Sequence, residues 1–268
     1  MSKTATKIFG QVGRRGLELA GQSREVGRLA RETFYWMLIA PFRGKGFKWK
    51  YVVEQMVKIG YESLPIVSLI AFFVGLIIAM QSAYQLKAFG ATIYTANLTA
   101  VSIIRELGPL LTAIIITGRN GSAITAEIGT MRVSEEIDAL ATMGLNPVKF
   151  LVVPRVLAMM IMLPCLTVIA DLVGIFGGYL ISMLTLDLTS VRYVDQTISA
   201  LTFKDLFSGL TKSGFFALII AGIGCHQGLI VRGGAEGVGK ATTRSVVVSI
   251  FLIIAADVLF TTLFYASF

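Results

Sequence analysis

The chain alternates between long apolar stretches and short polar segments, and this alternation predicts its architecture. Five apolar runs meet or nearly meet the ~20 residues that an α-helix needs to cross ~30 Å of hydrocarbon. They cover residues 63–82, 98–118, 156–186, 206–231 and 245–265. The third run is overlong and contains Pro164 and Asp171, so we expect it to tilt, kink or protrude. The pattern predicts an all-α membrane protein with five transmembrane helices.

A polar island, residues 119–154, separates the second and third runs. Within it the sequence predicts a short capped helix over about residues 134–144. Ser134 is a good N-cap, and Glu135 and Glu136 fall in the first turn, where the helix dipole favours negative charge. Gly144 is suited to close this helix, and Pro147 prevents its resumption.

The predicted helix carries a small apolar stripe beside its acids. Ile137, Leu140 and Ala141 form the stripe, and Asp138 adds a third acid to Glu135 and Glu136. A capped acidic helix held at a membrane face by two spans is shaped to dock onto another protein. We therefore predict that its apolar side chains insert in a groove of a partner; the alternative is an ordinary solvated loop helix.

The first sixty residues are basic and amphipathic, whereas the spanning apolar runs follow them. We therefore predict an N-terminal interfacial region, residues 1–60, and a transmembrane domain, residues 61–268. One amphipathic piece runs over about residues 8–39 and ends in aromatic side chains, and a second covers residues 47–59. Such helices lie among lipid headgroups. In the second piece we expect one apolar face, formed by Val52, Val53, Met56 and Val57. For residues 1–20 a disordered tail is the alternative.

Composition and charge fix the class and the expected orientation. With 55% hydrophobic and 15% charged residues, the chain is not an ordinary soluble domain. Twelve of the 24 Lys and Arg precede the first span, and most of the others fall in the second–third and fourth–fifth connections. The positive-inside rule then places the N-terminus and the acidic helix in the cytoplasm and the C-terminus outside. This asymmetry explains the net charge of +8 without nucleic-acid binding.

Ionisable residues within the spans mark candidate functional positions, because a charge in hydrocarbon is costly. The acids are Glu106, Asp171 and Asp257; Arg105 adjoins Glu106, and Pro109 loosens the helix just beyond. Each acid is expected to face protein, a cavity or a partner. For Glu106 a polar element of a transport path and a packing role stay equally open, while packing is favoured for the other two.

Catalytic and metal chemistry find no support in the sequence. Cys165 and Cys225 lack metal-site spacing, and the single histidine, His226, leaves no Ser/His/Asp set to assemble. Residues 234–241 approach the phosphate-binding pattern, but Ala241 stands where that pattern needs a hydroxyl. We expect a flexible cytoplasmic turn there, and no catalytic residue, metal or cofactor in this chain.

Two glycine pairs predict close helix contacts. Gly174 and Gly178 in the third span, and Gly224 and Gly228 in the fourth, have the G-x-x-x-G spacing that lets helix backbones approach. The spacing leaves open whether the contacting helix belongs to the same chain.

Several motifs together resemble one family. The runs Ala126–Leu140, Met143–Pro147 and Val153–Ala158, with Arg105–Pro109 and Arg232–Gly239, closely resemble MlaE-type permeases, the membrane subunits of ABC transporters that work with MCE proteins. The resemblance covers the chain from about residue 50 onward.

The resemblance implies a set of partners. It implies a homodimer with two ATP-binding subunits below, which bind ATP and Mg, and a periplasmic MCE-protein ring above. It implies phospholipid or a related lipid as substrate, a bacterial inner-membrane location, and residues 134–144 as the cytoplasmic coupling helix. Two alternatives stay open: a proton-coupled secondary transporter that uses the intramembrane acids, and a scaffold that only tethers lipid-binding proteins.

A lipid path needs an apolar wall with a few polar groups at its mouth. The first span offers a wall whose members lie close to one helical face, namely Leu69, Phe72, Phe73, Leu76 and Met80. We predict that spans one, two and five of both protomers enclose an outward-facing cavity, gated by Glu106 near the outer membrane surface.

Overall fold

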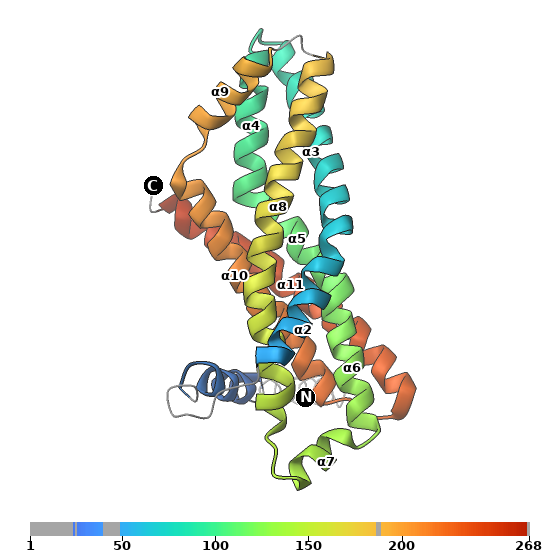
Figure 1. Ribbon diagram of the computed structural model, residues 1–268. Coiled ribbons are helices and arrows are strands. Elements are labelled where there is room, and N and C mark those ends of the chain that lie inside the picture. The colour runs from blue at the N-terminus through green and yellow to red at the C-terminus, as the bar shows by residue number, and fades with distance from the viewer. Residues whose placement is uncertain (1–23, 25, 40–48, 186–188, 267–268) are drawn as a thin grey trace, which may run out of the picture.

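The computed structural model describes residues 24, 26–39, 49–185 and 189–266, and its regular elements are all helical (Figure 1). Within these residues, five helical segments are long and apolar enough to cross a membrane. They are Trp49–Lys87, Thr92–Val133, Val148–Leu184, Phe203–Leu229 and Gly234–Phe264. The predicted all-α fold with five spans is confirmed. The predicted tail and the start of the first interfacial piece lie outside the described residues.

The first span contains more than the predicted apolar run. Helix α2 (Trp49–Ile59) leads through the short turn η3 (Tyr61–Ser63) into α3 (Leu64–Lys87). Val52 and Ile59 of α2 are buried, and α2 packs on the third span, whereas Val53 and Val57 are exposed. The exposure of Val53 and Val57 is compatible with an apolar face toward lipid, so the predicted face of α2 stays a prediction.

The second span is a series of helical segments interrupted by two π-helical turns. In order they are η4 (Thr92–Tyr94), α4 (Thr95–Ser102), η5 (Ile103–Leu107), α5 (Gly108–Ile116), η6 (Thr117–Gly121) and α6 (Ser122–Val133). A π-helical turn takes one extra residue and rotates the side chains that follow it. The first lies immediately before Pro109, which has no N–H for the helical ladder. The short helix α7 (Glu136–Thr142) follows α6.

The remaining spans are long single helices. The turn η7 (Val148–Val152) opens α8 (Val153–Thr185), and α9 (Ser190–Ala200) precedes α10 (Phe203–Leu229) and α11 (Gly234–Ala266). Helix α8 continues through Pro164, where the sequence allowed a kink.

The prediction of a flexible turn at residues 234–241 is wrong, because these residues form the first turns of α11. The chain reverses just before, where Gly233 and Gly234 take positive φ angles of 90° and 69°. Val238 packs beside Gly129 of α6, and Lys240 lies 2.6 Å from Glu236 one turn earlier. Contact with α6 therefore offsets the low helix propensity of the glycines.

Both glycine pairs pack within the chain. A Cβ at Gly174 would lie 3.3 Å from the carbonyl of Ala71, and one at Gly75 would collide with the backbone of Gly174. A Cβ at Gly228 would lie 2.8 Å from Ile128 of α6. The glycines thus set the closest contacts of α3 with α8 and of α10 with α6.

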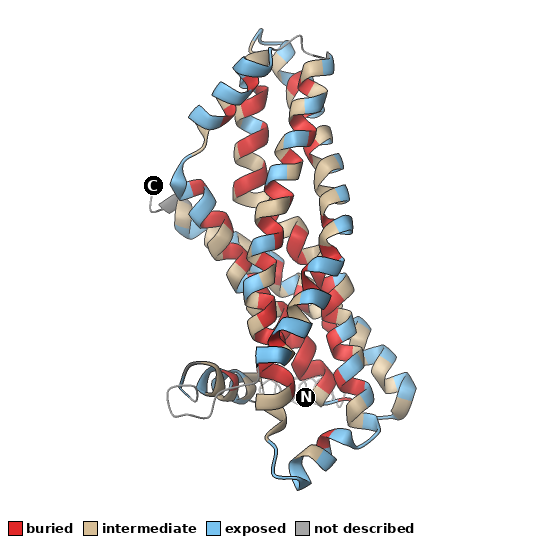
Figure 2. Cartoon of the chain, in the orientation of Figure 1, coloured by how far each residue is buried: buried red, intermediate tan, exposed pale blue. Residues whose placement is uncertain are grey.

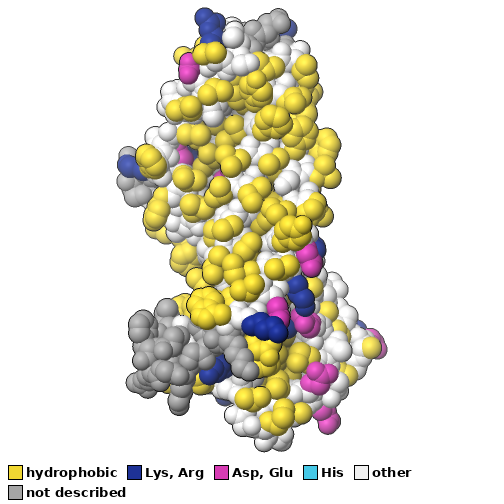
Figure 3. All heavy atoms as spheres, viewed as in Figure 1, with side chains coloured by type: hydrophobic (Ala, Val, Ile, Leu, Met, Phe, Trp, Pro, Cys, Tyr) yellow, Lys and Arg dark blue, Asp and Glu magenta, His cyan; other side chains and the backbone are white. Residues whose placement is uncertain are grey.

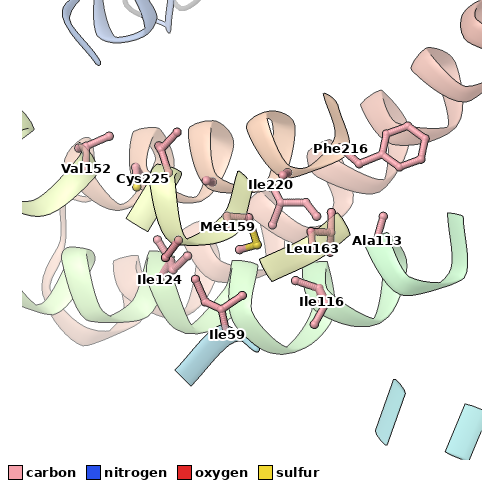
Figure 4. Close-up of a cluster of buried hydrophobic side chains, with 14 of the residues drawn as sticks. Ile59, Ala113, Ile116, Ile124, Val152, Met159, Leu163, Phe216, Ile220 and Cys225 are labelled. Atoms are coloured by element: carbon pink, nitrogen blue, oxygen red, sulfur yellow. The ribbon is translucent and has the colours of Figure 1, made fainter. Parts of the chain in front are cut away.

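The inward faces of these helices form one apolar core (Figure 2). Its centre lies where α8 and α10 cross the second span, and α2 adds Ile59 from below (Figure 4). The labelled members include Ile116, Met159, Leu163 and Phe216, all fully buried.

The molecule has two distinct ends, with α7 at one and α9 at the other (Figure 1). Charged side chains gather toward the α7 end, while the body between is largely hydrophobic in this view (Figure 3). Helix α9 is amphipathic: Tyr193 and Thr197 are buried, and Val191 and Ile198 are exposed. Burial raises the pKa of Tyr193 to about 12, so its hydroxyl stays protonated at neutral pH.

Candidate functional site

A buried lysine connects three spans inside the bundle. Lys212 of α10 is 1% exposed, and its Nζ lies 2.6 Å from Oε2 of Glu106 and 3.0 Å from Oδ1 of Asp257. It also donates to Oγ1 of Thr261 at 2.7 Å, and the Thr261 hydroxyl donates to Oε1 of Glu106 at 3.0 Å. We call Glu106, Lys212, Asp257 and Thr261 the charge cluster. One buried cation contacts two partly buried acids, so the charge of Lys212 has partners.

The local backbone explains why these side chains meet. Glu106 lies in the π-helical turn η5, and Gly209 of α10 packs directly against the carbonyl of Ile104 in that turn. Any larger side chain at position 209 would push α10 away. The glycine therefore brings Lys212, one turn further along α10, within reach of Glu106.

A second ion pair lies beside the charge cluster. Arg105 Nε donates to Oδ1 of Asp205, a nearly fully buried carboxylate. Oδ2 of Asp205 also accepts 2.8 Å bonds from the N–H and the hydroxyl of Thr202. The bond from the Thr202 N–H is one half of a capping box at the start of α10, and the Asp205 N–H to the Thr202 side chain is the other. Asp205 thus fixes the first turn of α10 and orients Arg105 at the same time.

The two ion pairs border a cavity of about 270 Å³. Its lining residues come from the second, fourth and fifth spans: Arg105, Glu106, Thr202, Lys204, Asp205, Ser208, Thr261 and Phe264. Side chains of both charge signs line it, so it suits a ligand that has a charged part. Glu106 lies about four helical turns from Thr92, the first residue of its candidate span, and its position relative to the outer membrane surface stays a prediction.

Asp171 stands apart from this cavity. It is buried in α8 beside Gly108, and its Oδ1 has no hydrogen-bond partner among the described residues. Of the three acids that the sequence singled out, the structure therefore brings together Glu106 and Asp257 but not Asp171.

The predicted apolar wall of α3 divides between two faces. Leu69, Phe73 and Met80 are exposed, whereas Phe72 contacts Phe176 of α8 with ring centroids 6.4 Å apart. Leu76 is half-buried. No α3 residue lines the cavity beside Glu106 within this chain.

Helix α7 differs from the prediction at its start and agrees at its end. Ser134 does not cap it: the Ser134 hydroxyl donates to Thr130 O and Glu136 Oε1, because α6 continues to Val133. Glu135 is the N-cap, with a φ of 60°. Gly144 closes the helix as predicted, since its N–H bonds Ala141 O while the next N–H bonds Leu140 O, which together make a Schellman motif.

Part of the apolar stripe of α7 packs within this chain. Ile137 is 6% exposed, so its predicted insertion into a partner is wrong. Leu140 is half-buried against the same core and Ala141 is exposed, so a partner contact of these two stays a prediction. The exposed surface instead carries Glu135 and Glu136, with Asp138 held 2.6 Å from Arg132. The exposed apolar side chains around α7 are Val133, Met143 and Leu145, which the sequence did not single out.

These features agree with the comparisons to known proteins. A family model described as Permease MlaE matches residues 52–263. The chain belongs to the MlaE permease family. A probable ABC transporter permease protein of Rickettsia felis is 44% identical over 214 residues, 80% of this chain and 83% of the relative. One from Rickettsia bellii is 39% identical over 258 residues, 96% and 98% of the two chains.

A more distant relative of this MlaE-family permease is a plant protein. The protein TRIGALACTOSYLDIACYLGLYCEROL 1, chloroplastic, of Arabidopsis thaliana is 35% identical over 217 residues, 81% of this chain and 62% of the relative. Membership in the permease family makes this chain the membrane component of an ABC transporter, and such a permease works with an ATPase partner.

Sequence reasoning about this permease missed two partners of its intramembrane charges. Lys212 and Asp205 complete the pairs of Glu106 and Arg105. A signal was present, because the acids at 106 and 257 and the lysine at 212 all fall within spans and need opposite charges.

A third ionic group near α7 was also missed. Arg155 of α8 is buried, and it pairs with Glu127 of α6 at 2.8 Å, while Lys58 of α2 lies 3.9 Å from the same carboxylate. Arg155 also donates to the carbonyl of Leu151 at 2.7 Å. This group connects the first three spans at the end of the molecule that carries α7.

Proposed function

We propose that two copies of this chain form the membrane-spanning part of an ABC transporter that moves phospholipid between a bacterial inner membrane and a periplasmic MCE protein. Two ATP-binding subunits hold and hydrolyse ATP with Mg²⁺, and the permease contributes no catalytic residue. The N-terminus and α7 face the cytoplasm, and the C-terminus faces the periplasm. The observation that carries the proposal is the charge cluster at a cavity between membrane spans.

The cavity supports a lipid as the substrate. A phospholipid has a charged head and apolar tails, and the cavity combines Arg105, Lys204 and Asp205 with Phe264. The exposed face of α3, with Leu69, Phe73 and Met80, provides apolar surface for the tails. Since α3 does not reach this cavity within one chain, the wall proposed for spans one, two and five is completed by α3 of the second copy. The glycerolipid in the name of the Arabidopsis relative also supports a lipid.

The second span supplies a route from the ATPase to the cavity. The helical segment Thr92–Val133 runs from Glu106 to α7 without a loop, so a movement of α7 is transmitted along one helix. The π-helical turns η5 and η6 are the places where this helix bends most readily. Nucleotide binding in the ATPase then moves α7, and the contact between Glu106 and Lys212 is replaced by another as the cavity opens.

The charge cluster also favours a second candidate function, because Glu106, Lys212 and Asp257 resemble a proton relay of a secondary transporter. Co-purification of the tagged full-length chain separates the two. An ABC permease is expected to bring down an ATPase in a two-to-two complex, and lipid movement in vesicles then requires ATP. Isolation without an ATPase, with lipid or solute movement driven by a pH gradient alone, would reject the proposal. A scaffold would move nothing under either condition.

A further inference from the structure

The N-terminal helix, residues 26–39, lies across the bundle at the α7 end (Figure 1). Between this helix and the bundle is a cavity of about 270 Å³ with almost wholly apolar walls. Leu29, Ala30 and Met37 line it from the N-terminal helix. Val156 of α8 and Ile219 and Gly222 of α10 line it from the bundle. We call this cavity the apolar slot.

The apolar slot has room that its own side chains do not fill. A Cβ built at Gly222 meets nothing within 4 Å, so the slot is open at the surface of α10. Its volume is slightly below the ~300–1,000 Å³ of pockets for whole small molecules. A slot of this size and polarity suits one hydrocarbon chain better than an entire lipid.

Positive charge lies next to the apolar slot. Arg28 and Arg31 are exposed on the N-terminal helix, and with Glu32 and Tyr35 they line a second hollow of about 620 Å³. Phe34 borders both hollows, so the two are neighbours along one helix. A basic hollow beside an apolar slot matches the phosphate and the acyl chain of one anionic phospholipid.

The N-terminal helix is also tied to the segment that joins α7 to α8. Asn146 Nδ2 donates to Oε1 of Glu32 at 2.8 Å, and Lys149 Nζ lies 5.0 Å from the centroid of the Trp36 ring. A ligand under this helix therefore contacts a unit that is continuous with the coupling helix.

We propose that the N-terminal helix and the bundle hold one anionic phospholipid, with an acyl chain in the apolar slot and its phosphate at Arg28 and Arg31. This lipid is separate from the transport cavity beside Glu106 and comes from the leaflet on the α7 side. By filling the slot it holds the N-terminal helix, and with it Asn146 and Lys149, against the bundle. The proposal does not depend on lipid being the transported substrate.

The test uses the full-length chain in nanodiscs that contain phosphatidylglycerol with a photoreactive diazirine on one acyl chain. Illumination followed by peptide mass spectrometry is expected to label α10 near Gly222 and the N-terminal helix. Gly222→Leu fills the slot and is expected to lower this labelling about tenfold. Arg28→Gln and Arg31→Gln are each expected to lower it roughly fivefold, as befits about one phosphate contact apiece.

Gly214→Leu is the matched control. Gly214 lies on the same helix, a Cβ there also meets nothing within 4 Å, and the residue does not line the slot. Unchanged labelling in Gly214→Leu together with loss in Gly222→Leu supports the proposal. Equal labelling in both glycine variants would overturn it. The proposal would also be overturned if a phosphatidylcholine probe were captured as strongly as phosphatidylglycerol and neither arginine variant changed that capture. Loss of the dimer in Gly222→Leu would also overturn it, since a second copy would then cover the slot.

Discussion

At the residue scale, Lys212 is the residue that connects the groups of the candidate site. It is fully buried, yet it contacts two carboxylates and a hydroxyl from two other spans. A buried cation of this kind gains little net stability from its pairs, but removing it leaves two partly buried acids without a cation. Because it contacts Glu106 and Thr261, which line the cavity, we expect both a structural and a functional role for it.

Replacement of Lys212 separates these two roles. Lys212→Met is expected to destabilise the protein by about 1–3 kcal/mol, because Glu106 and Asp257, both partly exposed, lose their cation. The triple variant Lys212→Met, Glu106→Gln, Asp257→Asn removes every charge of the cluster and is expected to recover most of that loss. Thermal unfolding in detergent measures the stabilities, and a vesicle assay measures lipid transfer.

Both variants are expected to lack lipid transfer, because the charge cluster is absent in each. Full transfer by the stable triple variant would show that the cluster only packs the helices. Glu106 would then have only the helix-packing role, which is one of the two roles that the sequence allowed.

At the element scale, close helix crossings depend on single glycines. Gly75→Ala would place a methyl group against the backbone of Gly174, which cannot move as a side chain can. We expect a loss of about 1–3 kcal/mol, as for other overpacked sites. Gly214→Ala is the control, since a Cβ there meets nothing within 4 Å, and its better helix propensity predicts a change within about 1 kcal/mol in the stabilising direction. Equal stabilities of the two variants would contradict the crossing at Gly75.

Helix α7 provides a second test at this scale. The double change Glu135→Lys and Glu136→Lys reverses exposed charge without touching the core, so membrane insertion and folding are expected to be retained. Binding of the ATPase and ATP-coupled transfer are expected to fall at least tenfold, because two favourable contacts become repulsive. Ile137→Asp is the contrast: it places a charge in the chain's own core and should reduce the amount of folded protein.

Co-purification and ATPase assays of the double variant test whether the acids of α7 contact the ATPase. An ATPase complex of normal yield and normal transfer would show that the acids of α7 do not face the partner. Loss of folded protein in the double variant would contradict the exposure of these two glutamates.

The elements show where sequence reasoning succeeds and where it stops. Apolar runs of spanning length predicted all five spans, because hydrocarbon requires continuous helices. The start of α7 was misplaced because Ser134 suits an N-cap, yet α6 extends to Val133, Ser134 is its C-cap, and Glu135 with a left-handed conformation caps α7. The helical residues 234–241 were missed because their glycines have low helix propensity, which packing against α6 offsets.

The candidate site was predictable only in part. The cost of charge in hydrocarbon identified Glu106 and Asp257, but the pairing with Lys212 depends on which helices are neighbours. Similarly, the apolar stripe of Ile137, Leu140 and Ala141 was visible in the sequence, whereas the burial of Ile137 within this chain depends on how α7 packs against the bundle.

At the scale of the whole molecule, α7 and α9 lie at opposite ends, and the basic residues predict which end is cytoplasmic (Figure 1). A cysteine at Glu135 is expected to react with a membrane-impermeant maleimide only from the cytoplasmic side. One at Asp195 is expected to react only from the periplasmic side, and both positions are exposed. Labelling of both from the same side would overturn the five-span topology.

The central claim is that a phospholipid moves through the cavity beside the charge cluster and that ATP hydrolysis by the partner controls this movement. The most direct measurement places a photo-crosslinking amino acid at Ser208, which lines that cavity, in the complex with its ATPase. Leu172, 65% exposed on α8, is the control for lipid that merely surrounds the protein. Position 208 is expected to capture phospholipid in an amount that changes when ATP hydrolysis is blocked, while capture at 172 stays constant. Equal, ATP-independent capture at the two positions would contradict the account.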